Sequence, residues 1–342
     1  MKKLIALLLI AAVFTFGGCG KKQDKQPQTT SKTNTQQTQH DEKKDAKDTF
    51  REMMQTDTRP IAVMIDNDGK SSRPQIGLES AYMVYEVIVE GGASRLMALF
   101  KDVSVSKVGP VRSSRHYFLD YALEHDAIYC HAGWSPKAAS DIRSLGVNNV
   151  NGVAGDGGVF YRDKTYDSTW HNLYTGVDSL YDYAVNSRGY RGTTDAKHLT
   201  YHDKDTDITD GSDALEISLP YSTYYRVSYT YDADQKLYKR YVDGTEHMSQ
   251  TGECLTAKNI IIMPVRNYNL QDGENKGRQE VNTVGSGSGK YITNGKAIDI
   301  TWSKASRSAK TTYSDLSGNE LILNPGNTYV QVVPLGSSVT VK

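Results

Sequence analysis

Apolar runs and turn residues alternate along the first part of the chain in the way that strands and helices alternate. The run IAVMI at 61–65 is continuous and lies between a proline and a polar turn, so it predicts a buried strand. Segments 85–90 and 94–100 flank a Gly-Gly pair and predict a β-hairpin. The run DAIYCHAG at 126–133 predicts another strand. SPKAASDIRSLG at 135–146 has the serine cap, first-turn proline and terminal glycine of a helix.

The pattern changes near residue 200. Segment 224–247 has two stretches of alternating polar and apolar residues joined by a turn, and NG, SG and NPG turns follow at short intervals. This spacing is typical of an antiparallel sandwich or barrel. We therefore predict an α/β-type N-terminal domain at 58–200 and a mainly antiparallel β C-terminal domain at 201–342. The predicted fold class is α+β.

The N-terminus has the pattern of an export signal. Two lysines precede an apolar stretch at 4–16, which is too short to span a membrane and has the length of a secretory signal. Two glycines and then Cys19 follow, which resembles a bacterial lipoprotein signal. Residues 1–19 are therefore predicted to be a signal peptide, with Cys19 lipidated as the mature N-terminus. An ordinary secretory signal with a chance cysteine is the alternative.

A polar segment follows the signal. Residues 20–48 contain no aromatic residue and no aliphatic residue larger than alanine. Such a segment cannot bury enough apolar surface to offset the entropy of ordering it. The sequence therefore predicts a flexible tether over 20–57 and a folded part that starts near Thr58.

Composition excludes some partners and leaves others open. The 40 basic residues balance the 40 acidic residues, so nothing indicates nucleic-acid binding. Besides Cys19, Cys130 and Cys254 could pair in an oxidising compartment, but two lone cysteines in different domains are more often unpaired. The 23 tyrosines against 6 phenylalanines fit an exported β-rich surface and also fit carbohydrate contact.

Cations are concentrated in the segment VGPVRSSRH, at 108–116. Ser113 or Ser114 is expected to cap a helix, which places Arg112, Arg115 and His116 near one face at its N-terminal end. The helix dipole makes that end partly positive, so cations there need a negative partner. That partner is either an external anion or an internal salt-bridge network, for which the candidate acids are Glu86, Glu90, Asp120 and Asp163.

Three charged residues of the hairpin have a structural explanation. Glu86 and Glu90 lie on its first strand, and Arg95 lies on the return strand. Opposite charges on neighbouring strands attract each other, so these residues are expected to pair across the hairpin.

Two histidines are better candidates for function than the neighbouring cysteine. Cys130 and His131 are adjacent on a predicted strand, so their side chains point to opposite faces and cannot form a nucleophile–base pair. His131 and His171 lie in loop-flanked motifs, where function is often located. With Asp163 or Asp167 they could bind zinc, but no local metal motif is present, and histidines bonded to the backbone are the simpler interpretation.

Several motifs together resemble the YerB-like lipoprotein family, a two-part domain of unknown function (DUF3048). They are VGPVRSSR, FLDYALEHDAIYCHAG, FYRDKTY, HNLYTG, YKRYVDG, TAKNIIIMPV and ITWSKASRS with LNPGNTYVQVVP. The resemblance covers essentially the whole chain after the tether. It implies export and a lipid anchor at the envelope of a Gram-positive bacterium. It implies no reaction and no catalytic residues.

These observations favour a binding or scaffold component at the outer face of the cytoplasmic membrane, anchored through Cys19. Its ligand is expected to be an anionic group of a cell-wall polymer or of an envelope protein, with no cofactor, no resident metal and no catalytic residue. The predicted ligand-binding residues are Arg112, Ser113, Arg115, His116, His131, Arg162, Asp163, His171 and Asn172. A hydrolase or transferase acting on peptidoglycan or a related polymer is the alternative, and a solute-binding lipoprotein of a transporter is a third.

Overall fold

The structure, a computed structural model, describes residues 46–342 except residue 168. The predicted signal peptide, the lipidation site Cys19 and most of the predicted tether lie outside the described residues. The described residues, 46–342 without 168, belong to one compact unit. Among the described residues, no helix is both long enough and apolar enough to cross a membrane.

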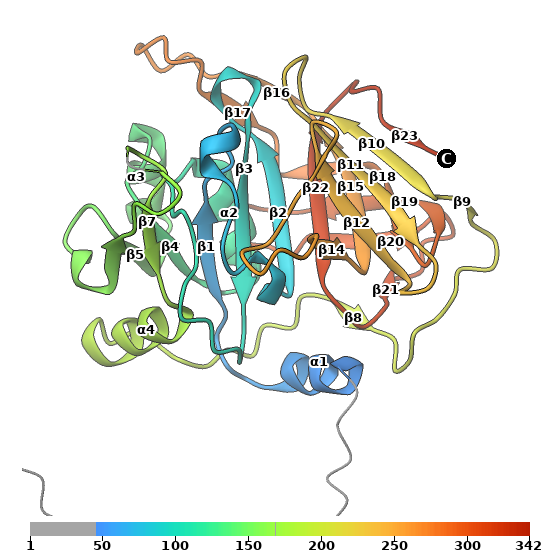
Figure 1. Cartoon of the computed structure of the whole chain (residues 1–342), viewed down its shortest axis with the longest axis horizontal. Helices are drawn as coiled ribbons and strands as arrows, with labels where there is room; N and C mark the ends of the chain where they lie inside the picture. The colour runs from blue at the N-terminus through green and yellow to red at the C-terminus, as the bar shows by residue number, and fades with distance from the viewer. Residues whose placement is uncertain (1–45, 168) are drawn as a thin grey trace, which may run out of the picture. The chain divides into compact units, whose positions relative to one another are not determined.

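A large mixed sheet runs through this unit (Figure 1). In spatial order, its described strands are β20 (Thr312–Asp315), β19 (Lys296–Lys304), β18 (Gly285–Thr293), β15 (Asn259–Val265), β22 (Thr328–Pro334), β2 (Met83–Ile88), β3 (Ser94–Phe100), β1 (Ile61–Ile65), β4 (Ile128–His131) and β5 (Asn149–Asn151), with β9 (Ser212–Asp213) also paired to β19. β1, β4 and β5 are parallel, as are β15, β22 and β2, and the other pairs are antiparallel.

A smaller antiparallel sheet packs beside it. Its described strands are β13 (Thr245–Glu246), β12 (Leu237–Val242), β11 (Arg226–Asp232), β10 (Glu216–Pro220) and β23 (Thr340–Val341), with β14 (Thr256–Ala257) paired to β12. Three short pairs complete the strands: β16 (Asn267–Asn269) with β17 (Gln279–Val281), β8 (Thr200–Tyr201) with β21 (Ile322–Leu323), and β6 (Phe160–Arg162) with β7 (Leu173–Thr175).

The hydrophobic pattern accounts for the position of each strand. All five residues of β1 are fully buried, as a continuous apolar run predicts for a strand covered on both faces. β12 alternates buried and half-buried residues, as expected for a strand with one face toward solvent. The predicted hairpin is confirmed by β2 and β3, and the pair at 224–247 by β11 and β12. The α+β fold class is confirmed.

In the described part of the chain, four α-helices accompany the strands: α1 (Ala46–Gln55), α2 (His116–Glu124), α3 (Pro136–Ser144) and α4 (Val177–Asp182), the last continuing as a π-helical turn at Tyr183–Ser187. Ser135 caps α3 as predicted, because its side chain accepts a hydrogen bond from the Ala138 amide. α1 lies in the segment predicted as tether. Its residues Phe50, Met53 and Met54 pack against the core, so ordered structure begins before Thr58.

The two predicted domains share the large sheet. β2 of the first half pairs in parallel with β22 of the second half, from Met83 opposite Thr328 to Val87 opposite Val332. In Figure 1 these two strands lie side by side at the centre of the molecule. The boundary placed between residues 200 and 201 is therefore not a break in the sheet.

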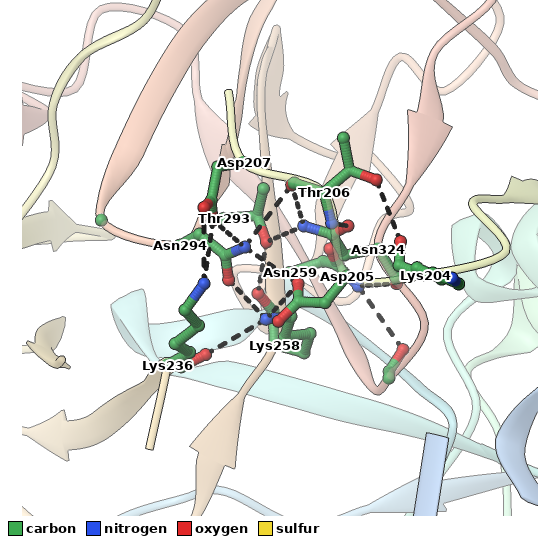
Figure 2. Close-up of polar contacts among 12 residues, drawn as sticks. Lys204, Asp205, Thr206, Asp207, Lys236, Lys258, Asn259, Thr293, Asn294 and Asn324 are labelled. Atoms are coloured by element: carbon green, nitrogen blue, oxygen red, sulfur yellow. Dashed lines mark hydrogen bonds and ion pairs between the residues drawn. The ribbon is translucent and has the colours of Figure 1, made fainter. Parts of the chain in front are cut away.

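A polar network fixes the connection between the halves (Figure 2). The Lys258 ammonium lies 2.8 Å from an Asp205 carboxylate oxygen, and both side chains are largely buried. The Asn294 amide donates to Asp205 and to Asp207, at 2.9 and 2.8 Å. The Asn324 side-chain oxygen accepts from the Thr206 amide at 2.7 Å. These bonds hold residues 205–207 against the ends of the neighbouring strands.

Candidate functional site

The buried carboxylate of Asp66 is the centre of the candidate site. Asp66 directly follows β1 and is fully buried. One of its oxygens lies 2.6 Å from His171 Nδ1 and 3.1 Å from Arg112 Nε. Two of the predicted site residues, Arg112 and His171, therefore meet through an acid that is not among the predicted site residues. The available signal was its position, since Asp66 is the first polar residue after a buried strand.

Charge interactions change the pKa values of this group. Burial by itself would raise the pKa of Asp66, but the His171 hydrogen bond and the charges of Arg112 and Arg95 lower it below its usual value. The hydrogen bond to Asp66 in turn raises the pKa of His171, against the effect of desolvation. Nε2 of His171 makes no hydrogen bond to any described residue.

The segment before α2 is extended, so the predicted helical arrangement of its cations is wrong. α2 begins at His116, and Arg115 occupies the N-cap without a side-chain capping bond. The Arg112 amide donates to the carbonyl of Met64, and the Arg112 carbonyl accepts from the Ala132 amide. These backbone bonds hold residues 111–114 between β1 and β4, and this tertiary pairing prevents an earlier helix start.

The arginines of this segment have internal partners. Arg115 Nε lies 2.6 Å from a Glu90 carboxylate oxygen. Burial would raise the pKa of Glu90, but the bond and the charge of Arg115 lower it below its usual value. Arg112 is paired to Asp66, so both arginines belong to an internal salt-bridge network. Such a network was one of the two predicted sources of negative charge for these cations.

Arg95, unlike Arg112 and Arg115, has no carboxylate partner among the described residues. The predicted pairing across the hairpin is wrong, because Glu86 bonds to Arg240 and Glu90 bonds to Arg115. Arg95 is only 5% exposed, and its NH1 donates to the Ser113 carbonyl at 2.6 Å. Its Nε has no hydrogen-bond partner, and no carboxylate of the described chain lies within salt-bridge distance of its guanidinium. Burial, together with the charges of Arg115 and Arg112, lowers the pKa of Arg95 to about 10, so it stays charged at neutral pH.

Arg95 lines a cavity of about 270 Å³, which we call the arginine pocket. Five cations line it: Arg95, Arg112, Arg115, Lys276 and Arg278. Two acids, Asp68 and Glu90, also line it, and Lys276 and Arg278 are paired with Glu274 and Asp272. Among the described residues, Arg95 is therefore the lining cation that has no ion-pair partner. Lys276 and Arg278 come from the connection between β16 and β17, which Figure 1 shows near one end of β3. The pocket thus combines residues from both halves of the chain.

Other predicted site residues have separate partners. His116 is buried and its Nε2 lies 2.9 Å from a Glu280 carboxylate oxygen. The ring nitrogens of His131 lie 2.8 Å from the Gly133 carbonyl and 3.1 Å from Asn149 Oδ1, and burial lowers the pKa of His131. His131 therefore has the structural environment that the simpler interpretation expects.

The remaining predicted residues lie around the β6–β7 hairpin or the extended segment. Arg162 NH1 donates to the Asn172 side-chain oxygen at 2.6 Å. Asp163 pairs with Lys107 and accepts from the Thr165 amide, so its charge is not directed at the arginines. The Ser113 hydroxyl donates to the Ala132 carbonyl at 2.8 Å, so this side chain has a structural role in the extended segment.

Metal-ligating side chains come together elsewhere. In the described part of the chain, ligand atoms of Glu124, His125 and His198 all lie within 4.8 Å of one another. The Lys304 ammonium, however, lies 2.6 Å from Glu124 and already balances its charge. The Tyr82 hydroxyl contacts Nδ1 of His125, and the Tyr85 hydroxyl contacts Nε2 of the same ring. We therefore interpret this group as a buried ion-pair network.

The cysteines and a larger cavity lie outside the site. Cys130 and Cys254 are both free, and burial raises the pKa of the Cys130 thiol well above its usual value, which makes it a poor nucleophile. A cavity of about 680 Å³ in the second half is lined by four aspartates and contains none of the predicted site residues. Its Lys290 is paired to Asp299 at 2.6 Å. The arginine pocket is smaller, but it is the better candidate for a ligand site because it contains the buried, unpartnered Nε of Arg95.

Comparison with known proteins identifies the family. Residues 49–191 match the N-terminal domain of a protein of unknown function (DUF3048), and residues 217–330 match its C-terminal domain. The chain is 29% identical over 283 residues to a Bacillus subtilis (strain 168) protein named "Putative lipoprotein YerB", covering 82% of each chain. It is 28% identical to the crystal structure of the YerB protein from Bacillus subtilis, with a TM-score of 0.73, covering 83% of this chain and 94% of that one. The chain therefore belongs to the DUF3048 family of YerB-like proteins.

Proposed function

We propose that this protein is an extracytoplasmic lipoprotein, anchored through Cys19, that binds an anionic group at the arginine pocket. The anchor rests on the signal pattern of residues 1–19 and on the name of the similar Bacillus subtilis protein. The anion rests on Arg95, the lining cation that has no ion-pair partner among the described residues. Inorganic phosphate, or a carboxylate or phosphate carried by a larger envelope molecule, has the required chemistry.

The observation that carries the proposal is the state of Arg95. A buried guanidinium is costly unless a negative group and hydrogen-bond acceptors compensate it. Arg95 has one carbonyl acceptor, an unpartnered Nε and no carboxylate within salt-bridge distance among residues 46–342 outside position 168. An anion in the arginine pocket would supply both the charge and the acceptors. Bidentate bonding to carboxylate or phosphate oxygens is the geometry that arginine provides best.

Thermal melting of the purified full chain in mild detergent tests the anion site. Phosphate at about 100 times its dissociation constant should stabilise the fold by about 2.7 kcal/mol. The Arg95→Gln variant should lose this stabilisation. The exposed Arg226 on β11 provides the matched control, and Arg226→Gln should keep it. If neither phosphate, sulfate nor acetate stabilises the wild-type chain, the anion site is wrong, and a buried water at Arg95 explains the structure.

A separate experiment tests the anchor. Metabolic labelling with an alkyne fatty acid should mark the wild-type protein and leave a Cys19→Ser variant unlabelled. Labelling that persists in the variant would contradict lipidation at Cys19.

One observation favours an envelope hydrolase or transferase as a second candidate. A buried carboxylate bonded to Nδ1 of His171, with Nε2 unused, is the arrangement of a general base with its orienting acid. No Ser, Thr or Cys hydroxyl or thiol of the described residues bonds to that histidine, so water or a substrate hydroxyl would be the nucleophile. Turnover of cell-wall fragments that is lost in His171→Gln would support this reading, and an inactive wild-type protein would count against it.

A further inference from the structure

A second cavity adjoins the arginine pocket. It measures about 400 Å³, and we call it the tryptophan pocket. Arg112 lines both cavities, so the two are neighbours. Thr169, Trp170, Asn172 and Leu173 line the tryptophan pocket together with Arg162 and Lys164. A ligand held in one pocket therefore has a second pocket within reach.

The tryptophan pocket is also positively charged. Arg112, Arg162 and Lys164 line it, and no Asp or Glu does. Neither Arg162 nor Lys164 has a described carboxylate within salt-bridge distance, since the Arg162 guanidinium bonds to the amide oxygen of Asn172. Two cations without paired acids, next to Arg112, make this cavity a second place for a negative group.

An exposed aromatic ring lines the same cavity as these charges. Trp170 is 74% exposed, and the neighbouring Val153, also lining the pocket, is 58% exposed. Burying an indole is strongly favourable, so a ring of this size left in water at the edge of a cavity marks a contact surface. The flat face of an indole suits the C–H face of a sugar ring, and flanking cations suit acidic groups on the same chain.

We propose that the ligand is an anionic glycan, an inference that rests on the proposed anion site. One acidic group binds Arg95 in the arginine pocket. A sugar ring packs on Trp170, and a second acidic group binds Arg162 and Lys164. Arg112 lies between the two pockets and contacts the segment that joins the two acidic groups. The site thus selects a repeating, charged saccharide over a single free anion.

Isothermal titration calorimetry on the full chain separates this inference from the anion site. The probes are inorganic phosphate, a dextran sulfate oligosaccharide, neutral dextran of the same length and polyglutamate of matched charge. We expect the sulfated oligosaccharide to bind at least about tenfold tighter than phosphate, and neutral dextran not to bind. Trp170→Ala should lower the affinity for the sulfated oligosaccharide by about tenfold and leave the affinity for phosphate unchanged. Leu316, 72% exposed at the larger cavity of the second half, lines neither pocket and provides the control Leu316→Ala, which should change neither affinity.

Three outcomes would overturn the inference in distinguishable ways. If phosphate binds through Arg95 but the oligosaccharide binds no tighter and Trp170→Ala has no effect, the glycan inference is wrong and the anion site stands. If polyglutamate binds as tightly as the oligosaccharide and Trp170 is irrelevant, the ligand is an acidic peptide. If no probe binds, both proposals are wrong. Because Trp170 is exposed, its replacement leaves the fold intact, which melting temperature and circular dichroism will verify.

Discussion

The buried ion pair between Glu86 and Arg240 joins the two halves of the molecule, and breaking it should destabilise the whole fold. Glu86 lies on β2 of the large sheet, and Arg240 lies on β12 of the smaller sheet. Both side chains are fully buried, and Arg240 NH2 lies 2.9 Å from Glu86 Oε2. Arg240 also donates to the Tyr229 hydroxyl at 2.8 Å and to His247 at 3.0 Å.

The cost of removing one partner follows from this burial. Arg240→Met would leave a buried, unpaired carboxylate, which typically lowers the free energy of unfolding by about 3–5 kcal/mol. Glu86 Oε1 still accepts from the hydroxyls of Ser94 and Tyr225, at 2.5 and 2.6 Å, but these neutral donors do not balance the charge. The double variant Glu86→Gln/Arg240→Met removes both charges, so it should recover most of the loss.

Urea denaturation followed by circular dichroism measures the effect. With a slope of about 3 kcal/mol per molar urea, the midpoint of Arg240→Met should fall by at least about 1 M. Lys290→Met, which removes a solvent-exposed pair with Asp299, should leave the midpoint nearly unchanged. The reasoning is refuted if Arg240→Met costs no more than Lys290→Met, or if the double variant is no more stable than Arg240→Met.

Three further predictions follow from the same structure. His171 has a raised pKa, so its bond to Asp66 contributes fully below the unfolded pKa of about 6.5 and is lost as pH rises through the higher folded value. The stability difference between wild type and His171→Gln, from urea midpoints, should therefore be larger at pH 6 than at pH 8.5, and a constant difference would contradict it. Lys258→Met removes the ammonium from the network in Figure 2 and should cost about 1–3 kcal/mol while speeding tryptic cleavage after Lys204; unchanged cleavage would show that the network does not hold this segment. In native protein at pH 8, peptide-resolved mass spectrometry should find Cys254 alkylated faster than the fully buried Cys130, and equal rates would contradict that burial.

The sequence by itself determined the local elements. The buried run of β1, the β2–β3 hairpin, the capped helix α3 and the β11–β12 pair all follow from periods and turn residues that lie within a few positions of one another. Local composition also predicts the signal pattern of residues 1–19, which lies outside the described residues, and it supplies the residue types of the candidate site. Neighbouring residues are sufficient for such predictions, since a short segment fixes which face of a strand or helix is apolar.

Only the tertiary structure decided which side chains meet. Asp66 and His171 are 105 positions apart, and Lys276 and Arg278 reach the arginine pocket from the far half of the chain. Residues 111–114 are extended rather than helical because their backbone groups bond to Met64 of β1 and to Ala132 and Gly133, which directly follow β4. Arg95 lost its expected partners because Glu86 and Glu90 bind other arginines. Long-range pairing determines which charged residues meet, and Arg95 is left buried with an unpartnered Nε because its expected partners pair elsewhere in the described chain.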